Sequence, residues 1–157
     1  MCINAHHWLP SVDLPGAIMY DVDHCIFCKI ASSRSHAYRV LEDEHCVAFL
    51  DVAPANPGHC LVVPRNHVAN VWEISAEAYA HVAGMVHRVA TLLRAALGPD
   101  GMNINNSTGE AAGQDVFHFH AHVIPRWHGD DLRPMWSASR ASSPELERVW
   151  AQLIAAR

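Results

Sequence analysis

The chain has 157 residues, of which 11 are Lys or Arg and 16 are Asp or Glu, giving a formal net charge of −5. This length suits one domain and excludes two independent hydrophobic cores. Because 50% of the residues are hydrophobic and the basic residues are scattered, the composition excludes a disordered chain and argues against nucleic acid as a partner.

The amino-terminal half predicts an arm followed by strands. Residues 1–23 show no hydrophobic period and are expected to form the arm, whereas residues 24–157 form a single domain. Segment 25–31 is predicted to be a compact knuckle. The polar residues 42–45 suit a hairpin turn, and Pro64 suits the end of a strand. Strands are therefore predicted at 38–41, 46–52 and 60–63.

The carboxy-terminal half predicts two helices and two further strands. Apolar residues at spacings of three and four predict a helix over 75–97, with Ser75 as its cap and Gly98 beyond its end. Ser143 as cap and Pro144 at the first helical position predict a closing helix. Its apolar stripe is Leu146, Val149, Trp150, Leu153 and Ile154. Between the helices, strands are expected at 102–105 and 116–124, with a small-residue loop at 109–113. These elements predict an α+β domain, an antiparallel sheet of about five strands with two helices packed against it.

The absence of a secretory pattern bears on the cysteines. No apolar run reaches roughly 18 residues, and no apolar core flanked by positive charge opens the chain. We therefore expect a cytoplasmic protein without a membrane segment. Five cysteines is an odd number, so a disulfide framework is disfavoured, and the C-x-x-C pair Cys25 and Cys28 points to metal or redox chemistry. Cys46 and Cys60 are expected to be buried as small apolar residues.

Three histidines alternate with apolar residues within the strand predicted at 116–124. In a strand, His118, His120 and His122 would project from one face. Such a row can bind catalytic zinc, or one ring can act as a nucleophile while its neighbours manage protons. The preceding loop, 109–113, offers backbone N–H groups for an anion. A phosphate beside these histidines favours nucleophilic attack at phosphorus.

The segment GQDVFHFHAHVIPR resembles the signature of the histidine triad (HIT) superfamily. CIFCKI and VLEDEHCVAFLDVAPANPGHCLVVPRNH resemble the amino-terminal half of the same family, so the resemblance covers residues 25–128. It implies a HIT-like fold, a homodimer, and a purine nucleotide or nucleotide conjugate as ligand. Two positions depart from the family pattern: Ser107 stands where relatives commonly have Asn, and Asp115 stands where they often have Ser. A carboxylate directed at a phosphate would oppose binding.

The resemblance also assigns roles. His120 would attack the α-phosphate of an AMP ester, phosphoramidate or dinucleoside polyphosphate, forming a covalent nucleotidyl-histidine that water or another acceptor resolves. His122 would contact the phosphate or leaving group, and His118 would orient the central ring. Gln114 would contact the phosphate and bridging oxygen, and Asp51 would accept from the ribose hydroxyls. The other nucleotide-binding candidates are Ile26, Phe27 and Phe49 around the base, together with Ser107, Asp115 and Val116.

Some HIT proteins carry a structural zinc site that corresponds here to Cys25, Cys28, His67 and His118. This Cys₂His₂ set suits closed tetrahedral zinc, and a pair of reduced thiols is the alternative. Two other functions stay open. The three strand histidines would hold catalytic zinc in a metallohydrolase, or the protein would bind nucleotides with little turnover. The leaving group would lie near segment 127–140, where Arg133 and Trp136 could touch substrate or a partner subunit.

Overall fold

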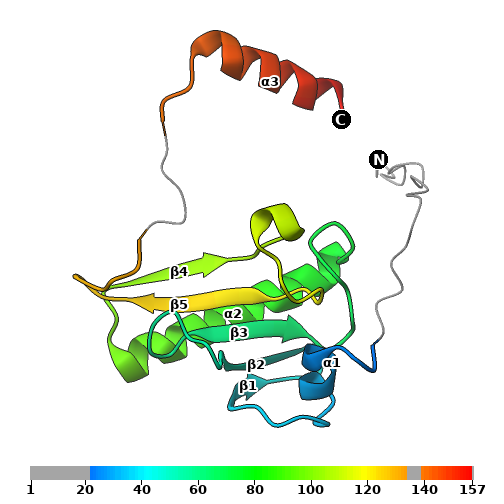
Figure 1. Cartoon of the computed structure of the whole chain (residues 1–157), viewed down its shortest axis with the longest axis vertical. Helices are drawn as coiled ribbons and strands as arrows, with labels where there is room; N and C mark the ends of the chain where they lie inside the picture. Colours follow the sequence, from blue (N-terminus) through cyan, green and yellow to red (C-terminus); the bar gives the residue numbers. More distant parts are fainter. Residues whose placement is uncertain (1–21, 134–138, 157) are drawn as a thin grey trace, which may run out of the picture.

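The computed structural model describes residues 22–133 and 139–156 and contains one five-stranded antiparallel sheet (Figure 1). The strand order is β1-β2-β3-β5-β4. The strands are β1 (Arg39–Glu42), β2 (Cys46–Leu50), β3 (Cys60–Pro64), β4 (Gly101–Asn105) and β5 (Ala121–Arg126). The helices are α1 (Ile26–Ala31), α2 (Ala76–Leu97), the short 3₁₀ turn η1 (Glu110–Ala112) and α3 (Ser143–Ala155). The predicted α+β class and five-stranded sheet are confirmed. Most of the predicted arm, and Trp136, lie outside the described residues.

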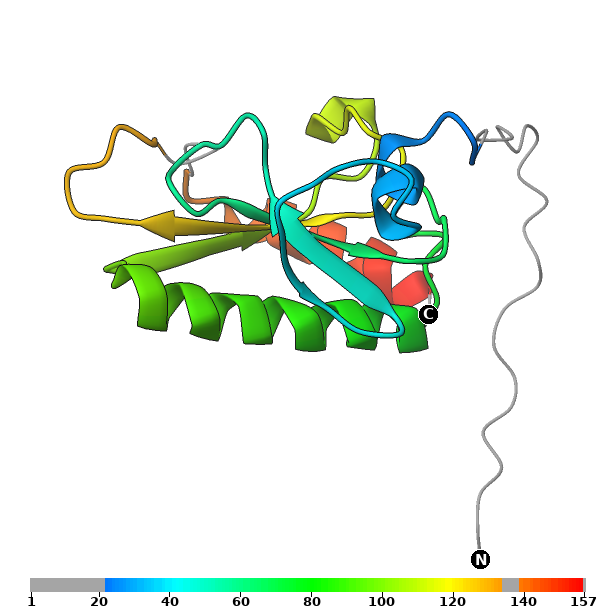
Figure 2. The same ribbon diagram turned by 90° about the horizontal axis from the view of Figure 1, so that it is seen from below.

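Helix α2 forms where the period predicted it and covers one face of the sheet (Figure 2). Ser75 caps its first turn, since the hydroxyl oxygen accepts from the backbone N–H of Ala78 at 3.1 Å. Gly98 ends it in the left-handed conformation, with φ 59°. The side chains that α2 buries against the sheet are Val82, Met85, Val86, Val89 and Leu93.

The two faces of the sheet have separate cores. Cys46 and Cys60 are fully buried on the α2 face, as predicted, and burial raises the pKa of each thiol to about 11. The side chains on the opposite face pack with α1; they are Val47, Phe49, Leu61 and Val63. The α2 face holds the larger of these two clusters, and residues of the α1 face line a cavity.

Gly58 lies in the turn before β3, and its backbone predicts a measurable cost of substitution. Its φ is +84°, and an added Cβ would lie 2.5 Å from Leu97 Cδ1. Gly58→Ala is expected to lower the free energy of unfolding by about 2 kcal/mol in urea denaturation. Gly84→Ala is the control: in α2 its Cβ would meet open space, so it should stabilise by about 0.5–1 kcal/mol. Equal effects at both positions would contradict this account.

Strand β5 begins later than predicted. The sequence predicted a strand over 116–124, whereas β5 (Ala121–Arg126) starts after two of the three histidines. The carbonyl of His118 accepts from the ring of His120, and the carbonyl of His120 accepts from the side chain of Asn106. Side chains thus take the place of ladder partners there, so His118 and His120 precede the strand and only His122 lies within it.

Two smaller predictions are also corrected. The predicted knuckle 25–31 is a helix, α1, so the domain has a third helix. The second strand was predicted over 46–52 but ends at Leu50. Asp51 Oδ1 accepts from the backbone N–H of Ala53 at 2.9 Å, and this turn ends the strand.

Helix α3 does not pack against the sheet, contrary to the prediction (Figure 1). Its cap is Ser142, one residue before the predicted cap Ser143. Every residue of α3 is exposed, including Trp150 at 64% and Leu153 at 65%. No other described segment of the chain therefore covers the amphipathic stripe of this helix. Over residues 22–133 and 139–156, none of the helices combines the length and apolarity that crossing a membrane requires.

Candidate active site

Four potential metal ligands converge beside α1. Cys25 caps α1, Cys28 lies in its first turn, His67 follows β3, and His118 precedes β5. Cys28 Sγ lies 3.2 Å from His67 Nδ1 and 3.4 Å from His118 Nδ1, and Cys25 Sγ lies 3.5 Å from His118 Nδ1. These four residues, predicted together from the resemblance, could hold a metal ion.

The donor set fits a tetrahedral ion. His118 Nε2 donates to the carbonyl of Pro64 at 2.9 Å, which leaves the lone pair of Nδ1 directed at the two sulfurs. In a regular zinc tetrahedron the sulfur-to-nitrogen edge is about 3.5 Å. Burial, followed by the neighbouring Cys25, raises the pKa of Cys28 to about 12. A cation is therefore what would keep this buried sulfur as a thiolate.

His120 is held in one tautomer. Its Nδ1 lies 2.7 Å from the carbonyl oxygen of His118, and because a carbonyl only accepts, Nδ1 carries the proton. The lone pair of a neutral ring is then on Nε2. The ring is 3% exposed and packs edge-on to Phe27, with centroids 5.2 Å apart. His120 is thus oriented as a nucleophile would need to be.

His122 is oriented by a chain of hydrogen bonds. The backbone N–H of Ala55 donates to His59 Nδ1 at 3.1 Å, so the proton of a neutral His59 is on Nε2. That Nε2 lies 2.9 Å from His122 Nδ1, which accepts. The proton of His122 is therefore on Nε2, where it can be donated to a ligand. Asp51 Oδ2 lies 3.5 Å from His59 Nδ1 and would replace Ala55 only if His59 were protonated.

The rings of His59 and His122 are both neutral at neutral pH. Burial lowers the pKa of His59, and burial followed by His120 and His59 lowers the pKa of His122 to about 4. In the unfolded chain a histidine titrates near 6.5. The unfolded state therefore binds protons that the folded state excludes as the pH falls from about 6.5 to about 4. Stability from His122 is full above this window and is lost within it.

This predicts a pH-dependent difference between variants. From pH 7 to pH 4.5, the free energy of unfolding should fall on the order of 1–2 kcal/mol more in the wild type than in His122→Gln. Urea denaturation across this range measures the difference. His87→Gln is the control, because His87 is exposed on α2 and should follow the wild type. Parallel curves for the wild type and His122→Gln would contradict the neutral assignment.

A cavity of about 460 Å³ brings most of the predicted nucleotide residues together. Phe27 and Phe49 meet edge to face, with centroids 5.6 Å apart, and form part of an apolar wall. A carboxylate, Asp51, lies at the end of β2 beside them. The predicted residues that line the cavity are Ile26, Phe27, Phe49, Asp51, Asp115, Val116, His120 and His122. Its size is typical of a site for a small organic ligand.

Gln114 and Ser107 lie elsewhere. Gln114 is 3% exposed, and its amide bonds main-chain groups: Nε2 donates to Ala69 O at 2.7 Å and Oε1 accepts from Gly109 N at 2.8 Å. It supports the loop before the histidines. Ser107 lines a second cavity. The predicted anion cradle is also changed, because backbone N–H groups within the loop already donate to loop acceptors; they belong to Gly109, Ala112, Gly113 and Gln114.

Two residues outside the predicted set hold the histidines in place. Asn106 Nδ2 donates to the carbonyl of His120 at 2.7 Å, and its Oδ1 accepts from Thr108. His59 fixes His122, as described above. The only sequence signal for Asn106 was that it directly precedes Ser107, the residue that stands where relatives commonly have Asn. For His59 the signal was a histidine after the turn-forming Pro and Gly.

The three triad histidines do not share one ion site. Among the described residues, His118 groups with the two cysteines and His67, while His122 groups with Asp51 and His59; His120 belongs to neither group. The common ligand group that a metallohydrolase using all three histidines would need is therefore not formed among the described residues.

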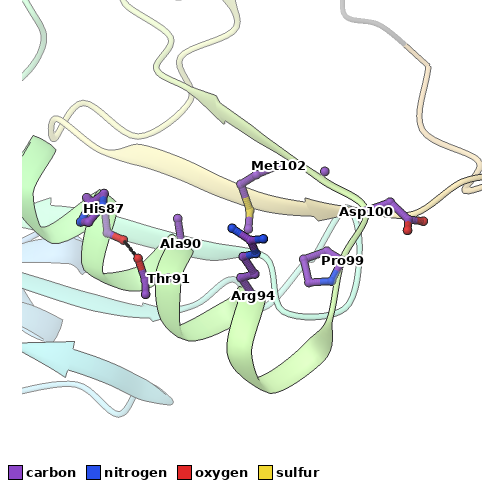
Figure 3. Close-up of a pocket in the computed structure, with 8 residues that line it drawn as sticks. His87, Ala90, Thr91, Arg94, Pro99, Asp100 and Met102 are labelled. Atoms are coloured by element: carbon purple, nitrogen blue, oxygen red, sulfur yellow. Dashed lines mark hydrogen bonds between the residues drawn. The ribbon is translucent and has the colours of Figure 1, made fainter.

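A further cavity, of about 390 Å³, lies between α2 and β4 (Figure 3). Arg94 extends from α2 toward Met102 of β4, and His87 lies further along the helix (Figure 3). This cavity shares no lining residue with the histidine site. Arg94 is therefore a cation that lines a cavity separate from the histidine site.

Comparison with known proteins identifies the family. A model of the HIT domain matches residues 32–129. Protein hit of Bacillus subtilis is 41% identical over 119 residues, covering 75% of this chain and 82% of that protein. The adenylylsulfatase HINT3 of Arabidopsis thaliana is 33% identical over 132 residues, covering 83% of this chain and 66% of that protein. A solved structure of a zinc-bound histidine triad family protein from Mycobacterium smegmatis is 38% identical, covers 87% of this chain and 100% of that one, and has a TM-score of 0.69. Because the family model matches more than half of the chain, the protein belongs to the HIT domain family.

Proposed function

We propose that the protein hydrolyses or transfers the nucleotidyl group of nucleotide conjugates through a covalent nucleotidyl-His120. Substrates of this class are AMP esters, phosphoramidates and dinucleoside polyphosphates. The observation that carries the proposal is the fixed tautomer of His120, whose ring lines the same cavity as the apolar wall and Asp51. The naming of one relative as an adenylylsulfatase supports a hydrolase with an adenylyl substrate.

The chemistry follows from the hydrogen bonds. His120 Nε2 forms a bond to the α-phosphorus while the bond to the leaving group breaks, and the leaving group takes the electron pair. The carbonyl of His118 stabilises the positive ring that results, because it accepts the Nδ1 proton. His122 Nε2–H donates to the phosphate oxygens or to the leaving atom. Water or another acceptor then attacks phosphorus and frees His120. Asp51 binds the ribose hydroxyls.

We propose zinc as the ion at Cys25, Cys28, His67 and His118. Two thiolates and two imidazoles are zinc ligands, and a zinc-bound relative of the same fold supports the choice. When bound, zinc supplies structural cross-linking of α1 to the segment before β5. A reducing cytoplasm, where the thiols stay available, suits this site.

Trapping the intermediate tests the function. The wild type is mixed with adenosine 5′-phosphoramidate, quenched without acid over seconds, and measured by intact mass and peptide fragmentation. We expect an adenylyl adduct on His120 that precedes AMP release. AMP release with the adduct on another residue would overturn the role of His120. Tight AMP binding without adduct or product would leave a nucleotide-binding module instead.

We also propose a homodimer. Strand β4 is an edge strand with Ile104 55% exposed, and α3 exposes an apolar stripe. A second copy would bury both features. Light scattering during size-exclusion chromatography should give twice the chain mass, and Trp150→Glu should shift the population toward the chain mass, whereas the polar-face control Arg148→Glu should not. A monomeric wild type would contradict the proposal.

A further inference from the structure

His122 lines two cavities. One is the nucleotide cavity of about 460 Å³, and the other is a second cavity of about 620 Å³. The second is bounded by β4, β5 and the loop around η1, and Ser107 and Arg133 also line it. A ring that donates to the leaving atom must lie between the space for the nucleotide and the space for the leaving group. His122 has this position.

We propose that the second cavity binds the leaving group and favours an oxyanion, such as sulfate, phosphate or carboxylate, with Arg133 as the cation. This inference rests on the proposed nucleotidyl transfer at His120. It adds what that function leaves open, namely the chemical class of the group that departs.

The lining of the second cavity is polar and positive at one end. The lining residues include no Asp or Glu; the polar ones among them are His59, Asn103, Asn105, Ser107, His122, Arg126 and Arg133. Apolar contacts come from Ile124 and Leu132. An anion that carries an apolar or small organic portion would match both parts of this surface.

The two arginines differ in availability. Arg126 is engaged: Nε donates to Asp130 Oδ2 at 2.7 Å and Nη2 to Asp130 Oδ1 at 2.6 Å, while Nη1 donates to Asn103. Its charge is balanced by Asp130, whose carboxyl pKa is held well below its usual value by this pairing. Within the described residues, Arg133 makes no ion pair and is exposed at the cavity. Arg133 is therefore the guanidinium that can pair with an incoming anion.

The chemistry of departure separates two classes of leaving group. In both, the bond from His120 Nε2 to phosphorus forms as the bond to the leaving atom breaks, and the electron pair leaves with that atom. An amine must also receive a proton, which it takes from solvent and leaves as ammonia, while His122 Nε2–H donates a hydrogen bond to the departing nitrogen. Sulfate or a phosphate departs as a stable anion and needs no proton, so a nearby positive charge assists it instead. Arg133 should therefore matter for anions and not for amines.

Steady-state kinetics with two substrates test this. Adenosine 5′-phosphosulfate releases an oxyanion, and adenosine 5′-phosphoramidate releases ammonia. We expect Arg133→Ala to lower kcat/KM at least about 10-fold for the phosphosulfate and less than about 2-fold for the phosphoramidate. Arg133→Lys should recover part of the loss. Arg94→Ala, which removes a cation from the cavity of Figure 3, should change neither value. Equal losses for both substrates, or no loss for either, would overturn the inference.

Binding of an uncleavable ligand separates this inference from the proposed function. In α,β-methylene-ADP the methylene bridge prevents transfer, and the β-phosphonate would occupy the second cavity. Calorimetry should show about 10-fold weaker binding of this ligand to Arg133→Ala, with AMP affinity unchanged. Equal affinities for α,β-methylene-ADP would overturn the anion site even in an active enzyme. If the wild type showed no turnover but still bound α,β-methylene-ADP more tightly than Arg133→Ala does, only the proposed function would be contradicted.

Discussion

Replacing Cys28 with serine is expected to abolish binding of the proposed zinc ion and to lower the free energy of unfolding by at least about 3 kcal/mol. Cys28 Sγ lies within 3.2–3.4 Å of the Nδ1 atoms of both His67 and His118, so it links the two histidine ligands. Serine keeps the size of the side chain but supplies a poor zinc ligand. Metal analysis of the purified protein, followed by urea denaturation, measures both effects.

The control is Cys60→Ala. Cys60 is fully buried in the α2-face core and belongs to no group of potential ligands among the described residues. This variant should lose about 1 kcal/mol from a small cavity and keep its metal. A chelator should lower the stability of the wild type and of Cys60→Ala, but not that of Cys28→Ser. A wild type without metal, unaffected by chelator, would show that the cysteines are a reduced thiol pair.

The metal site also bears on catalysis through one carbonyl. His118 gives its ring to the ligand group and its carbonyl to His120 Nδ1. Without a metal ion, the carbonyl oxygen of His118, which fixes the tautomer of His120, would be held less firmly. A structural ion could then change kcat without touching the substrate.

Much of the fold could be predicted because its signals are local. The period of α2, the cap at Ser75 and the stop at Gly98 all lie within one helix. The strands β2 and β3 are short apolar runs bounded by polar turns, so their existence follows from sequence, and their burial on both faces agrees with the continuous apolar pattern. Strand register and strand order are not local properties, so the hydrophobic periodicity of a segment does not predict them.

The incorrect predictions concern elements whose bounds or packing depend on groups distant in the sequence. The start of β5 depends on Asn106, 14 residues away, which takes the carbonyl of His120. The stripe of α3 indicates that one face of a helix avoids water, but it does not say whether this chain or a second copy covers it. Periodicity alone predicted both elements, and in both the missing information was a contact.

The site was predicted in a similar way. The nucleotide residues follow from motif resemblance, and the structure brings most of them to one cavity. Gln114 and Ser107 are the exceptions: the amide of Gln114 bonds the loop backbone, and Ser107 lines a second cavity. The chain from Ala55 through His59 to His122 could not be read from spacing, since its last two members are 63 residues apart.

Replacing His120 with glycine is expected to lower kcat/KM for adenosine 5′-phosphoramidate by roughly 10⁴-fold, because the atom that forms the bond to phosphorus is lost. A structural role would predict the same loss, so rescue distinguishes the two. Added imidazole should enter the space left by the ring, restore release of ammonia, and give adenylyl-imidazole in solution. His122→Gly is the matched variant: it keeps the nucleophile, so its adenylyl adduct should form on His120 whether or not imidazole is added. Residual activity above about a tenth of wild type in His120→Gly would remove the covalent route. Absence of rescue, with wild-type AMP affinity, would instead make His120 a residue that only positions the phosphate.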